Sequence, residues 1–278
     1  MSENPQVKVW NDTVGGAWTT HAEHFDTQLQ PFGDAVLDRL AVQPHERVVD
    51  VGCGTGATTV DLGGLAQEVL GVDLSVPMLA MARQRVAAVR ATNVNFAEVD
   101  VQAAPFTDTQ FDVAFSRFGV MFFSDPVRAF THIRQSLIPG GRLGFVCFGD
   151  VGDNPFMLVP VMAAAAHLPM PPMPGPTAPG PFSLADVDRT TGILAAAGFS
   201  DVTILPGPDS VTLGSADDLS AVAQRTVEQN PMSGAGMMAA TPAARAAAVA
   251  AAAEALAAHV AHDNVVLAAR TWVVTATA

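Results

Sequence analysis

Three glycines at alternate positions, Gly52, Gly54 and Gly56, directly follow the run Arg47-Val48-Val49-Asp50-Val51. A glycine at the end of a strand lets the chain turn sharply, and further glycines let a ligand approach the amide groups at the start of the next helix. The run therefore predicts a ligand-binding loop. It lacks the Gly-Lys-Ser/Thr ending of a phosphate-binding P-loop, so a nucleoside triphosphate is not expected.

Two aspartates further along the chain indicate what the loop binds. Asp73 ends a second apolar run 21 residues after Gly52, where a carboxylate accepts hydrogen bonds from ribose hydroxyls. Asp100, followed by Val101 and Gln102, places an acceptor for an exocyclic amine beside an apolar surface for a base. The spacing G-x-G-x-G makes less provision for a pyrophosphate than the dinucleotide fingerprint G-x-G-x-x-G. We expect an adenosine without phosphates, linked by sulfur to a compact amino acid.

The elements around these residues form a repeating pattern. Short β-branched runs alternate with longer helical segments between residues 30 and 150, which predicts a doubly wound α/β core with a mostly parallel sheet. The strands are expected at 47–51, 69–73, 94–100, 111–116 and 142–148, the helices at 30–41, 56–66, 76–91 and 126–137, and a turn at Pro139-Gly140-Gly141. Beyond it we expect helices at 154–167, 185–197, 216–230 and 242–262, a proline-rich loop at 167–182, and strands at 201–213 and 265–277.

Composition excludes several classes of partner and site. The net charge of −13 would repel a polyphosphate backbone, so nucleic acid is not an expected partner. Two cysteines, Cys53 and Cys147, are too few for a disulfide framework or a zinc site, and no metal site is expected. The first residues resemble no signal peptide, and the most apolar stretch, 246–260, is interrupted by Glu254. We expect a cytoplasmic protein without a membrane span, and a homodimer is left open.

The segments that carry these residues resemble the class I S-adenosylmethionine-dependent methyltransferases, nearest the ubiquinone/menaquinone-biosynthesis-type branch that acts on small molecules. In chain order they are VVDVGCGTGATT, GVDLSVPMLAMAR, EVDVQAAPF and FDVAFSRFGVMFFSDPVRAFTHIRQSLIPGGRLGFVCF, which together cover about 47–148. The resemblance implies a Rossmann-like sheet of seven strands with the last strand antiparallel, helices on both faces, and S-adenosylmethionine as cofactor. It implies contacts from Gly52, Cys53 and Gly54 to the methionine part, Asp73 and Leu74 to ribose, Met78, Asp100 and Val101 to adenine, and Ser116 and Arg117 to the methionine side.

On this basis we divide the chain into four parts: an N-terminal lid segment at 1–29, the S-adenosylmethionine-binding core at 30–150, a substrate-covering insertion at 151–200, and strands and helices at 201–278 that complete the sheet. Trp10, Trp18, Phe25 and Phe182 lie in the parts expected to cover the site. These apolar side chains predict a small, largely apolar or aromatic methyl acceptor.

No residue is assigned as catalytic. A sulfonium methyl group is already activated, so alignment of donor and acceptor can supply about 7–11 kcal/mol of the barrier without a side-chain base. If the acceptor is a hydroxyl, a histidine is the expected base, and His21, His24 and His167 lie in the covering segments. The pattern places His45 and His132 on loops or helix surfaces. Arg117 is expected in the ligand crevice or in an ion pair with an acid.

Two alternatives to a methyltransferase stay open. One is a non-catalytic protein that only binds S-adenosylmethionine, which the motifs allow. The other is a nicotinamide-dependent oxidoreductase, which the missing sixth-position glycine and the lack of a Tyr-Lys proton donor disfavour.

Overall fold

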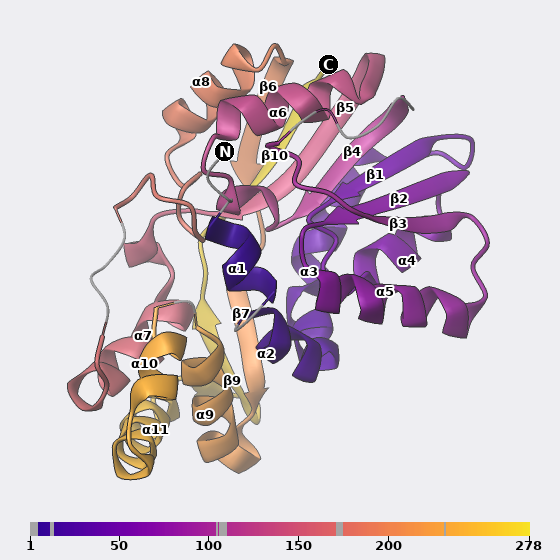
Figure 1. The fold of residues 1–278 in the computed structure, drawn as a ribbon. Helices are drawn as coiled ribbons and strands as arrows, with labels where there is room; N and C mark the ends of the chain where they lie inside the picture. Colours follow the sequence, from indigo (N-terminus) through magenta and orange to yellow (C-terminus); the bar gives the residue numbers. More distant parts are fainter. Residues whose placement is uncertain (1–4, 12–13, 104, 106–109, 171–174, 231) are drawn as a thin grey trace. The chain divides into compact units, whose positions relative to one another are not determined.

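The computed structural model describes residues 5–11, 14–103, 105, 110–170, 175–230 and 232–278 (Figure 1). Its larger sheet has seven strands in the order β3-β2-β1-β4-β5-β10-β6. Their bounds are β1 Arg47–Val51, β2 Glu68–Asp73, β3 Val94–Glu98, β4 Phe111–Arg117, β5 Leu137–Phe148, β6 Ser200–Pro206 and β10 Thr271–Thr277. The last strand, β10, runs antiparallel to both β5 and β6, while the pairs among β1 to β5 are parallel. The predicted Rossmann-like sheet is confirmed.

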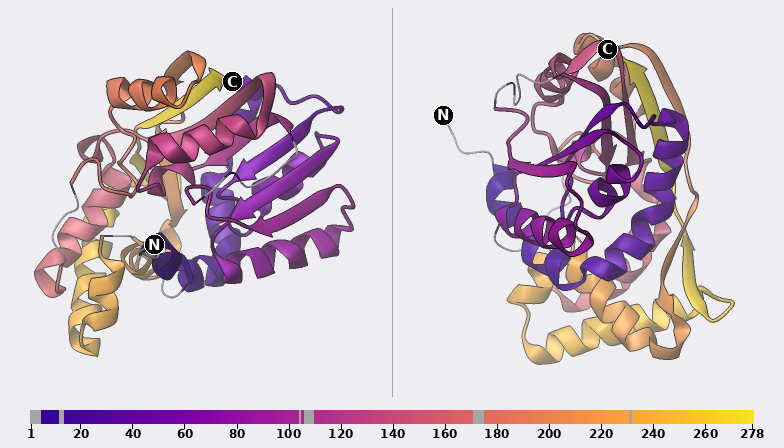
Figure 2. Two further views of the ribbon diagram at one scale, coloured as in Figure 1. Left: turned by 45° about the horizontal axis from the view of Figure 1, so that its top comes forward. Right: turned by 90° about the vertical axis from the view of Figure 1, so that its right-hand side faces the viewer.

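Helices lie on both faces of this sheet, as Figures 1 and 2 show. One face carries α3 Ala22–Leu40, α4 Ala57–Gly63 and α5 Val76–Val89, and the other carries α6 Pro126–Gln135 and α8 Val187–Ala196. Strands covered on both faces are mostly apolar, and residues 48–51 of β1 are all buried, with Asp50 as their one polar side chain. Two short N-terminal helices, α1 Pro5–Asn11 and α2 Val14–Thr20, precede α3, and α2 packs beside α5.

The strand order reverses between β1 and β4, because the chain first adds β2 and β3 on one side of β1 and later adds β4 and β5 on the other. Open α/β sheets bind ligands in the crevice beyond the carboxyl ends of the strands at such a switch point. The glycine loop follows β1 at this point, so the fold places it where a ligand is expected.

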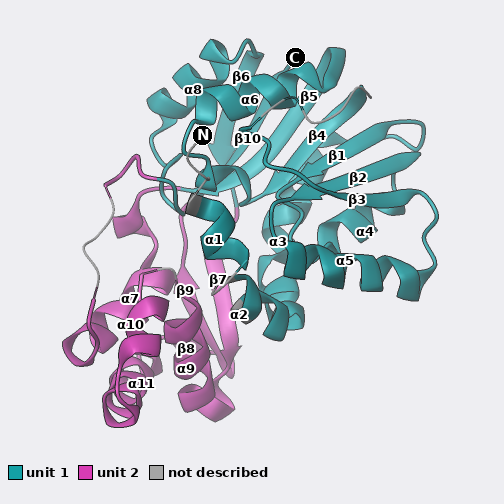
Figure 3. Cartoon of the chain, viewed as in Figure 1, with its two compact units in different colours: residues 1–148, 179–207, 271–278 teal, residues 149–178, 208–270 magenta. Residues whose placement is uncertain are grey.

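The chain forms two compact units (Figure 3). Unit 1, Met1–Phe148, Pro179–Gly207 and Thr271–Ala278, contains the seven-stranded sheet. Unit 2, Gly149–Ala178 and Pro208–Arg270, contains α7 Pro155–Ala164, α9 Leu219–Gln229, α10 Gly234–Ala239 and α11 Pro242–Ala257. It also has an antiparallel sheet in the order β7-β9-β8, with β7 Ser210–Ser215, β8 Val260–Ala261 and β9 Asn264–Ala268. One-turn 3₁₀ helices lie at Val120–Phe122, Val151–Asp153, Ala165–His167 and Ala216–Asp218.

The units do not coincide with the four expected parts. The strand expected at 201–213 is two strands in different sheets, β6 and β7, and the strand expected at 265–277 is likewise β9 and β10. Pro208 cannot donate a ladder hydrogen bond, and the chain leaves unit 1 there after Gly207 donates its amide hydrogen to the Thr271 carbonyl. Residues 201–278 therefore contribute only β6 and β10 to the large sheet, and 208–270 belong to unit 2.

Two further elements differ from expectation. Helix α3 begins at Ala22 and has Pro31 in its interior, so the boundary expected after residue 29 falls inside a helix. Pro139-Gly140-Gly141 lies within β5 rather than in a turn before the strand. The register against β4 shifts there, since Phe111 pairs with Leu137 but Val113 pairs with Arg142. The extra residues bulge out of the ladder, and Gly140 provides the positive φ of 77° that the bulge needs.

Candidate functional site

The glycine loop after β1 is held in a left-handed conformation. Gly52, Gly54 and Gly56 have φ angles of 72°, 55° and 80°, a region that residues with a Cβ rarely enter. A Cβ on Gly52 would lie 2.8 Å from the Gly119 Cα, and one on Gly54 would lie 2.9 Å from the Met78 Cε. The glycines therefore serve two purposes: they leave the backbone accessible, and they let the loop pack against α5 and against the segment after β4.

Asp73, at the end of β2, is oriented by two backbone amides. The Gly54 N–H donates to Oδ2 and the Ser75 N–H donates to Oδ1, each over 2.8 Å. Burial raises the pKa of Asp73 above its ordinary value, and these two hydrogen bonds oppose that rise. Each carboxylate oxygen has more than one acceptor lone pair, so both can still accept a ligand hydroxyl. The structure thus brings the predicted ribose acceptor into direct contact with the glycine loop.

Asp50 in β1 is a polar residue that the sequence reasoning did not single out. It is 2% exposed, and the Thr59 hydroxyl in α4 donates a hydrogen bond of 2.6 Å to its Oδ2. Burial raises the pKa of Asp50 to about 6, against the lowering effects of Thr59 and Arg117. An acid in an otherwise apolar strand was the available signal, because buried carboxylates are rare unless they have a partner. The contact ties α4 to the strand that carries the glycine loop.

The predicted adenine-side residues form a turn after β3. The Gln102 N–H donates to Asp100 Oδ1 over 3.0 Å, and the Val101 side chain is buried. His132 Nδ1 lies 2.7 Å from the Val101 carbonyl oxygen, which can only accept, so Nδ1 carries the proton. The prediction that His132 lies on a helix surface is wrong: it is buried on α6, where it holds this turn.

Gln102 connects the same turn to the start of α6. Its Oε1 accepts hydrogen bonds from the Ser124 N–H and hydroxyl and from the Asp125 N–H, over 2.7 to 2.9 Å. Asp125 in turn caps α6 by accepting from the Arg128 N–H. The segments after β3 and β4 are thereby joined beyond the carboxyl ends of the two strands.

Ser116 and Arg117, at the carboxyl end of β4, have protein partners for their polar groups. The buried Ser116 hydroxyl donates to the Val51 carbonyl over 2.7 Å. Arg117 Nη2 lies 3.8 Å from Asp26 Oδ1 in α3, and Asp26 Oδ2 lies 2.6 Å from Arg85 Nη1. Burial lowers the pKa of Arg117, and the negative charges of Asp26 and nearby acids oppose this. The geometry favours the ion-pair expectation for Arg117, and its contact with a cofactor stays a prediction.

Leu74 and Met78 flank Asp73 and the start of α5. Met78 is 4% exposed and lies against the glycine loop, and its contact with adenine stays a prediction. The Leu74 carbonyl accepts a hydrogen bond of 3.0 Å from Asn11 Nδ2, so the N-terminal residues reach the turn after β2. No pattern in the sequence indicated this contact, which spans 63 positions.

An aromatic cluster from the N-terminal helices contacts the segment after β4. Trp10 meets Phe122 edge-on with ring centroids 5.0 Å apart, and it meets Trp18 at 6.1 Å. Trp18 stacks on Phe25 at 4.0 Å with an interplanar angle of 11°. Aromatic pairs in these arrangements contribute beyond the area that they bury. Three of the four rings were expected in a covering segment, and the structure brings them together at the carboxyl ends of the strands.

A second aromatic group lies at the ends of β4 and β5. Phe118 has a φ of 61°, an uncommon and strained value for a bulky side chain. Its ring stacks on Phe148 at 4.2 Å and meets Phe32 edge-on at 5.4 Å, while Phe182 lies 6.4 Å from Phe148. Phe118 directly precedes Gly119, which packs against Gly52 of the glycine loop. The strained backbone of Phe118 therefore places its aromatic ring in the switch-point region.

The remaining candidates give no further catalytic group. His21 and His24 lie at the start of α3, and His167 lies in unit 2. Burial raises the pKa of the Cys53 and Cys147 thiols, which makes thiolate chemistry unfavourable at both. Among the described residues, no group of three or more His, Cys, Asp or Glu side chains could hold a metal ion. Within those same parts of the chain, none of the helices combines the length and apolarity of a membrane crossing.

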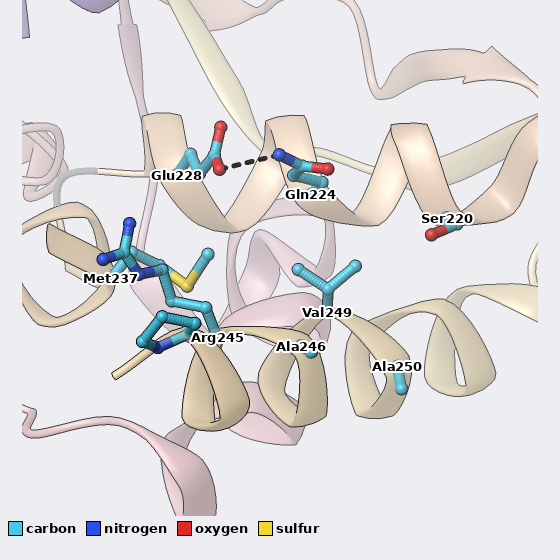
Figure 4. Close-up of a pocket in the computed structure, with 9 residues that line it drawn as sticks. Ser220, Gln224, Glu228, Met237, Arg245, Ala246, Val249 and Ala250 are labelled. Atoms are coloured by element: carbon cyan, nitrogen blue, oxygen red, sulfur yellow. Dashed lines mark hydrogen bonds between the residues drawn. The ribbon is translucent and has the colours of Figure 1, made fainter. Parts of the chain in front are cut away.

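Unit 2 has a cavity of about 520 Å³ between α9, α10 and α11 (Figure 4). Gln224 Nε2 on α9 donates a hydrogen bond of 3.0 Å to Glu228 on the same helix, and Val249 on α11 faces them. The lining also includes Ser220, Met237, Pro242, Arg245, Ala246 and Ala250. None of these residues belongs to the candidate cofactor site, which lies wholly in unit 1.

Comparison with known proteins agrees with this geometry. Residues 49–145 match the methyltransferase domain family. The chain is 32% identical over 168 residues to the O-methyltransferase cnsE of Penicillium expansum, covering 60% of this chain and 56% of that protein. It is 38% identical over 125 residues to the demethylmenaquinone methyltransferase of Thermus thermophilus, covering 44% and 56%. The matches thus span about half the length of these curated relatives.

A solved structure shares the fold over most of the chain. The phosphoethanolamine N-methyltransferase 2 of Haemonchus contortus, in complex with phosphomonomethylethanolamine and S-adenosylhomocysteine, superposes with a TM-score of 0.54 at 20% identity over 88% of this chain and 52% of that one. At this identity the likeness shows the fold alone. The family resemblance expected from the motifs is confirmed, and the matched range 49–145 contains every residue predicted to contact the cofactor.

Proposed function

We propose that this chain, whose residues 49–145 form a methyltransferase domain, transfers a methyl group from S-adenosylmethionine to a small, largely apolar or aromatic molecule. One observation carries the proposal: the glycine loop after β1 donates the Gly54 N–H to the Asp73 carboxylate at the switch point of a seven-stranded sheet. This arrangement joins an accessible backbone to a ribose acceptor, and it lies inside the range that matches the family.

The residues fit the cofactor chemically. The three glycines with positive φ leave backbone where a side chain would otherwise stand, which suits the amino acid part. Asp73 keeps lone pairs for ribose hydroxyls, and Asp100 with the apolar Val101 suits an adenine. When bound, S-adenosylmethionine supplies a methyl group that its sulfonium has already activated for displacement.

The chain's own contribution is to hold the two reactants in line and to exclude water. Trp10, Trp18 and Phe122 at the carboxyl ends of the strands, and Phe118 with Phe148, offer apolar surfaces for a planar acceptor. Correct alignment alone can account for about 7–11 kcal/mol of a barrier. We therefore assign no general base, and whether oxygen, nitrogen or carbon accepts the methyl group follows from the substrate.

The proposal also covers the binding partners, the cellular location and the oligomeric state of the protein. The net charge of −13 supports a small-molecule substrate rather than nucleic acid. Two free cysteines and no expected disulfide support a reducing cytoplasm. A homodimer stays open, and sedimentation of the purified protein would decide it.

A screen with S-adenosylmethionine labelled in its methyl group tests the function directly. The purified protein is incubated with small molecules from cell extract, and mass spectrometry identifies a labelled product. We expect transfer to an apolar or aromatic acceptor, with micromolar binding of S-adenosylhomocysteine by calorimetry and none of NAD. Binding without any transfer would favour a non-catalytic binding protein, and binding of NADH seen by fluorescence would favour an oxidoreductase.

A further inference from the structure

We propose that Asn11 is a positioning residue, which holds the turn after β2 and thereby sets the Asp73 carboxylate for the ribose of the cofactor. The inference rests on the proposed function, because it concerns the same site. Asn11 lies outside the matched range 49–145. The motifs predict no residue in the N-terminal segment that affects cofactor binding.

The Asn11 amide binds the backbone on both sides of Ser75. Its Nδ2 donates to the Leu74 carbonyl over 3.0 Å, and its Oδ1 accepts from the Val76 N–H over 2.9 Å. An asparagine side chain carries both a donor and an acceptor, so it can bridge two backbone groups as a neighbouring strand would. The turn between β2 and α5 is therefore fixed from the N-terminal end of the chain.

This contact replaces the cap that α5 lacks. The first N–H groups of a helix have no partner within the helix, and a serine before it usually accepts from one of them. Ser75 stands at that position but accepts no such bond, and its hydroxyl donates to the Trp10 carbonyl over 2.8 Å. Asn11 satisfies the Val76 N–H instead, so the first turn of α5 depends on a residue 65 positions away.

The turn in question also orients the ribose acceptor. Ser75 is fully buried, and its N–H is one of the backbone groups that hold the Asp73 carboxylate. Another, the Gly54 N–H, comes from the glycine loop. If the segment from Leu74 to Val76 shifts, Asp73 loses the restraint from Ser75 while the glycine loop stays in place. Asn11 thus acts on the ribose contact through Ser75.

Two adjacent glycines in α2 provide a second way to disturb this contact. A Cβ on Gly15 would clash with the Trp10 carbonyl oxygen and lie 3.1 Å from Ser75 Oγ, whereas a Cβ on Gly16 would meet nothing within 4 Å. Gly15→Ala therefore forces apart the Trp10 carbonyl and the Ser75 hydroxyl, whose hydrogen bond joins the N-terminal segment to Ser75. Gly16→Ala is its matched control, one position along the same helix.

The experiment measures dissociation constants by calorimetry for S-adenosylhomocysteine and for its 2′-deoxy analogue. We expect Asn11→Ala to weaken binding of S-adenosylhomocysteine by about tenfold, since it removes the side-chain hydrogen bonds to the Leu74 carbonyl and the Val76 N–H that fix the turn, together with one to the Val7 carbonyl. Asn11→Asp keeps the acceptor for Val76 and loses the donor to Leu74, so we expect an intermediate loss. Thr20→Ala, which removes only a hydrogen bond to Gly16 within the N-terminal region, should leave the constant unchanged.

The 2′-deoxy analogue separates positioning from a general structural role. The wild type should prefer the ribose ligand over the analogue, and this preference should shrink in Asn11→Ala and Gly15→Ala but persist in Gly16→Ala. Equal losses for both ligands, or no loss in either variant, would overturn the assignment of Asn11. If the wild type itself binds no S-adenosylhomocysteine, the proposed function fails first and the inference falls with it.

Discussion

Gly52 and Gly119 approach each other so closely that neither position can carry a side chain. A Cβ on Gly52 would lie 2.8 Å from the Gly119 Cα, and a Cβ on Gly119 would lie 2.9 Å from the Gly52 Cα and 2.8 Å from the Val51 carbonyl oxygen. The segments after β1 and β4 thus meet through their backbones at the switch point. Gly119 is therefore as necessary to the candidate site as the glycines of the loop itself.

Gly119→Ala should weaken cofactor binding and destabilise the fold. Its backbone angles, φ −75° and ψ −37°, suit alanine, so any effect comes from the contact and not from backbone strain. We expect a loss of about 1–3 kcal/mol in the free energy of unfolding, as for other overpacked sites. Urea unfolding and calorimetry with S-adenosylhomocysteine measure the two effects. Gly192→Ala in α8, where a Cβ would meet nothing within 4 Å, is the control.

The sequence predicted the glycine loop but could not predict this partner. Gly119 follows the pattern SRF, and only the pairing of β1 with β4 shows that the two glycines meet. The sequence pattern also placed His132 on a helix surface, whereas the residue is buried. Phe130 and Ile133 beside it on α6 are buried too, and these apolar neighbours were the available signal that His132 faces inward. Local patterns fix which residues are apolar, whereas contacts between distant segments depend on the strand order.

Asp73→Ala should weaken binding of S-adenosylhomocysteine by about 1–3 kcal/mol, because the ribose hydroxyls lose a charged acceptor. The variant also releases the Gly54 and Ser75 amides that Asp73 now binds. Asp73→Asn helps to separate these effects, since its amide keeps one oxygen acceptor. Calorimetry measures the binding, and circular dichroism checks that the fold survives. An unchanged dissociation constant in a folded Asp73→Ala variant would restrict Asp73 to a structural role.

Asp50 should make the protein less stable as the pH rises from about 4 to 6. Its pKa is raised from 3.8 to about 6 in the folded state, so in that window the unfolded chain releases a proton that the folded protein retains. The stabilisation is complete below about pH 4 and is lost above about pH 6, a difference of about 3 kcal/mol for a shift of about two pKa units. Asp50→Asn removes this titration and keeps an acceptor for Thr59.

Urea unfolding at several pH values measures the effect as the difference between wild type and variant. That difference should change steadily between pH 4 and 6 and level off outside the window. Glu23→Gln, at an exposed carboxyl on α3, controls for the loss of a charge. A constant difference across the window would mean that Asp50 titrates as an ordinary carboxyl.

Removal of residues 1–20 should impair methyl transfer far more than it disturbs the sheet. The predicted boundary after residue 29 would cut α3, so the truncation has to end before Ala22. It deletes Trp10 and Trp18, which contact Phe122 and Phe25, and it leaves the seven strands intact. A loss of alignment of this kind can reduce the rate by about 10²-fold. Turnover at the wild-type rate would show that the N-terminal helices are no part of the active site.

The two expected strands that the structure divides show what sequence periodicity does not predict, namely the sheet to which a strand belongs. The alternating stretch from 201 to 213 predicts one strand, and both halves are indeed extended. Because β6 pairs with β10 while β7 pairs with β9, the halves belong to different sheets. Alternation identifies an extended chain, but the choice of partner depends on Pro208 and on segments more than 50 residues away. The core elements, their ligand loop and the helices α7, α9 and α11 of unit 2 were predictable, whereas the second sheet and the division into two units were not.

The final prediction concerns the mechanism of transfer. No described contact identifies His21, His24 or His167 as a general base: the first two lie at the start of α3, and the third lies in unit 2. If alignment carries the rate, the single substitutions His21→Ala, His24→Ala and His167→Ala should each lower kcat by less than about tenfold, whereas loss of a general base costs about 10²–10⁴-fold. Once a substrate is known, kcat is measured against pH for all three variants. A hundredfold loss in one of them, together with the disappearance of a titration near neutral pH, would identify a catalytic histidine and replace alignment as the main source of the rate.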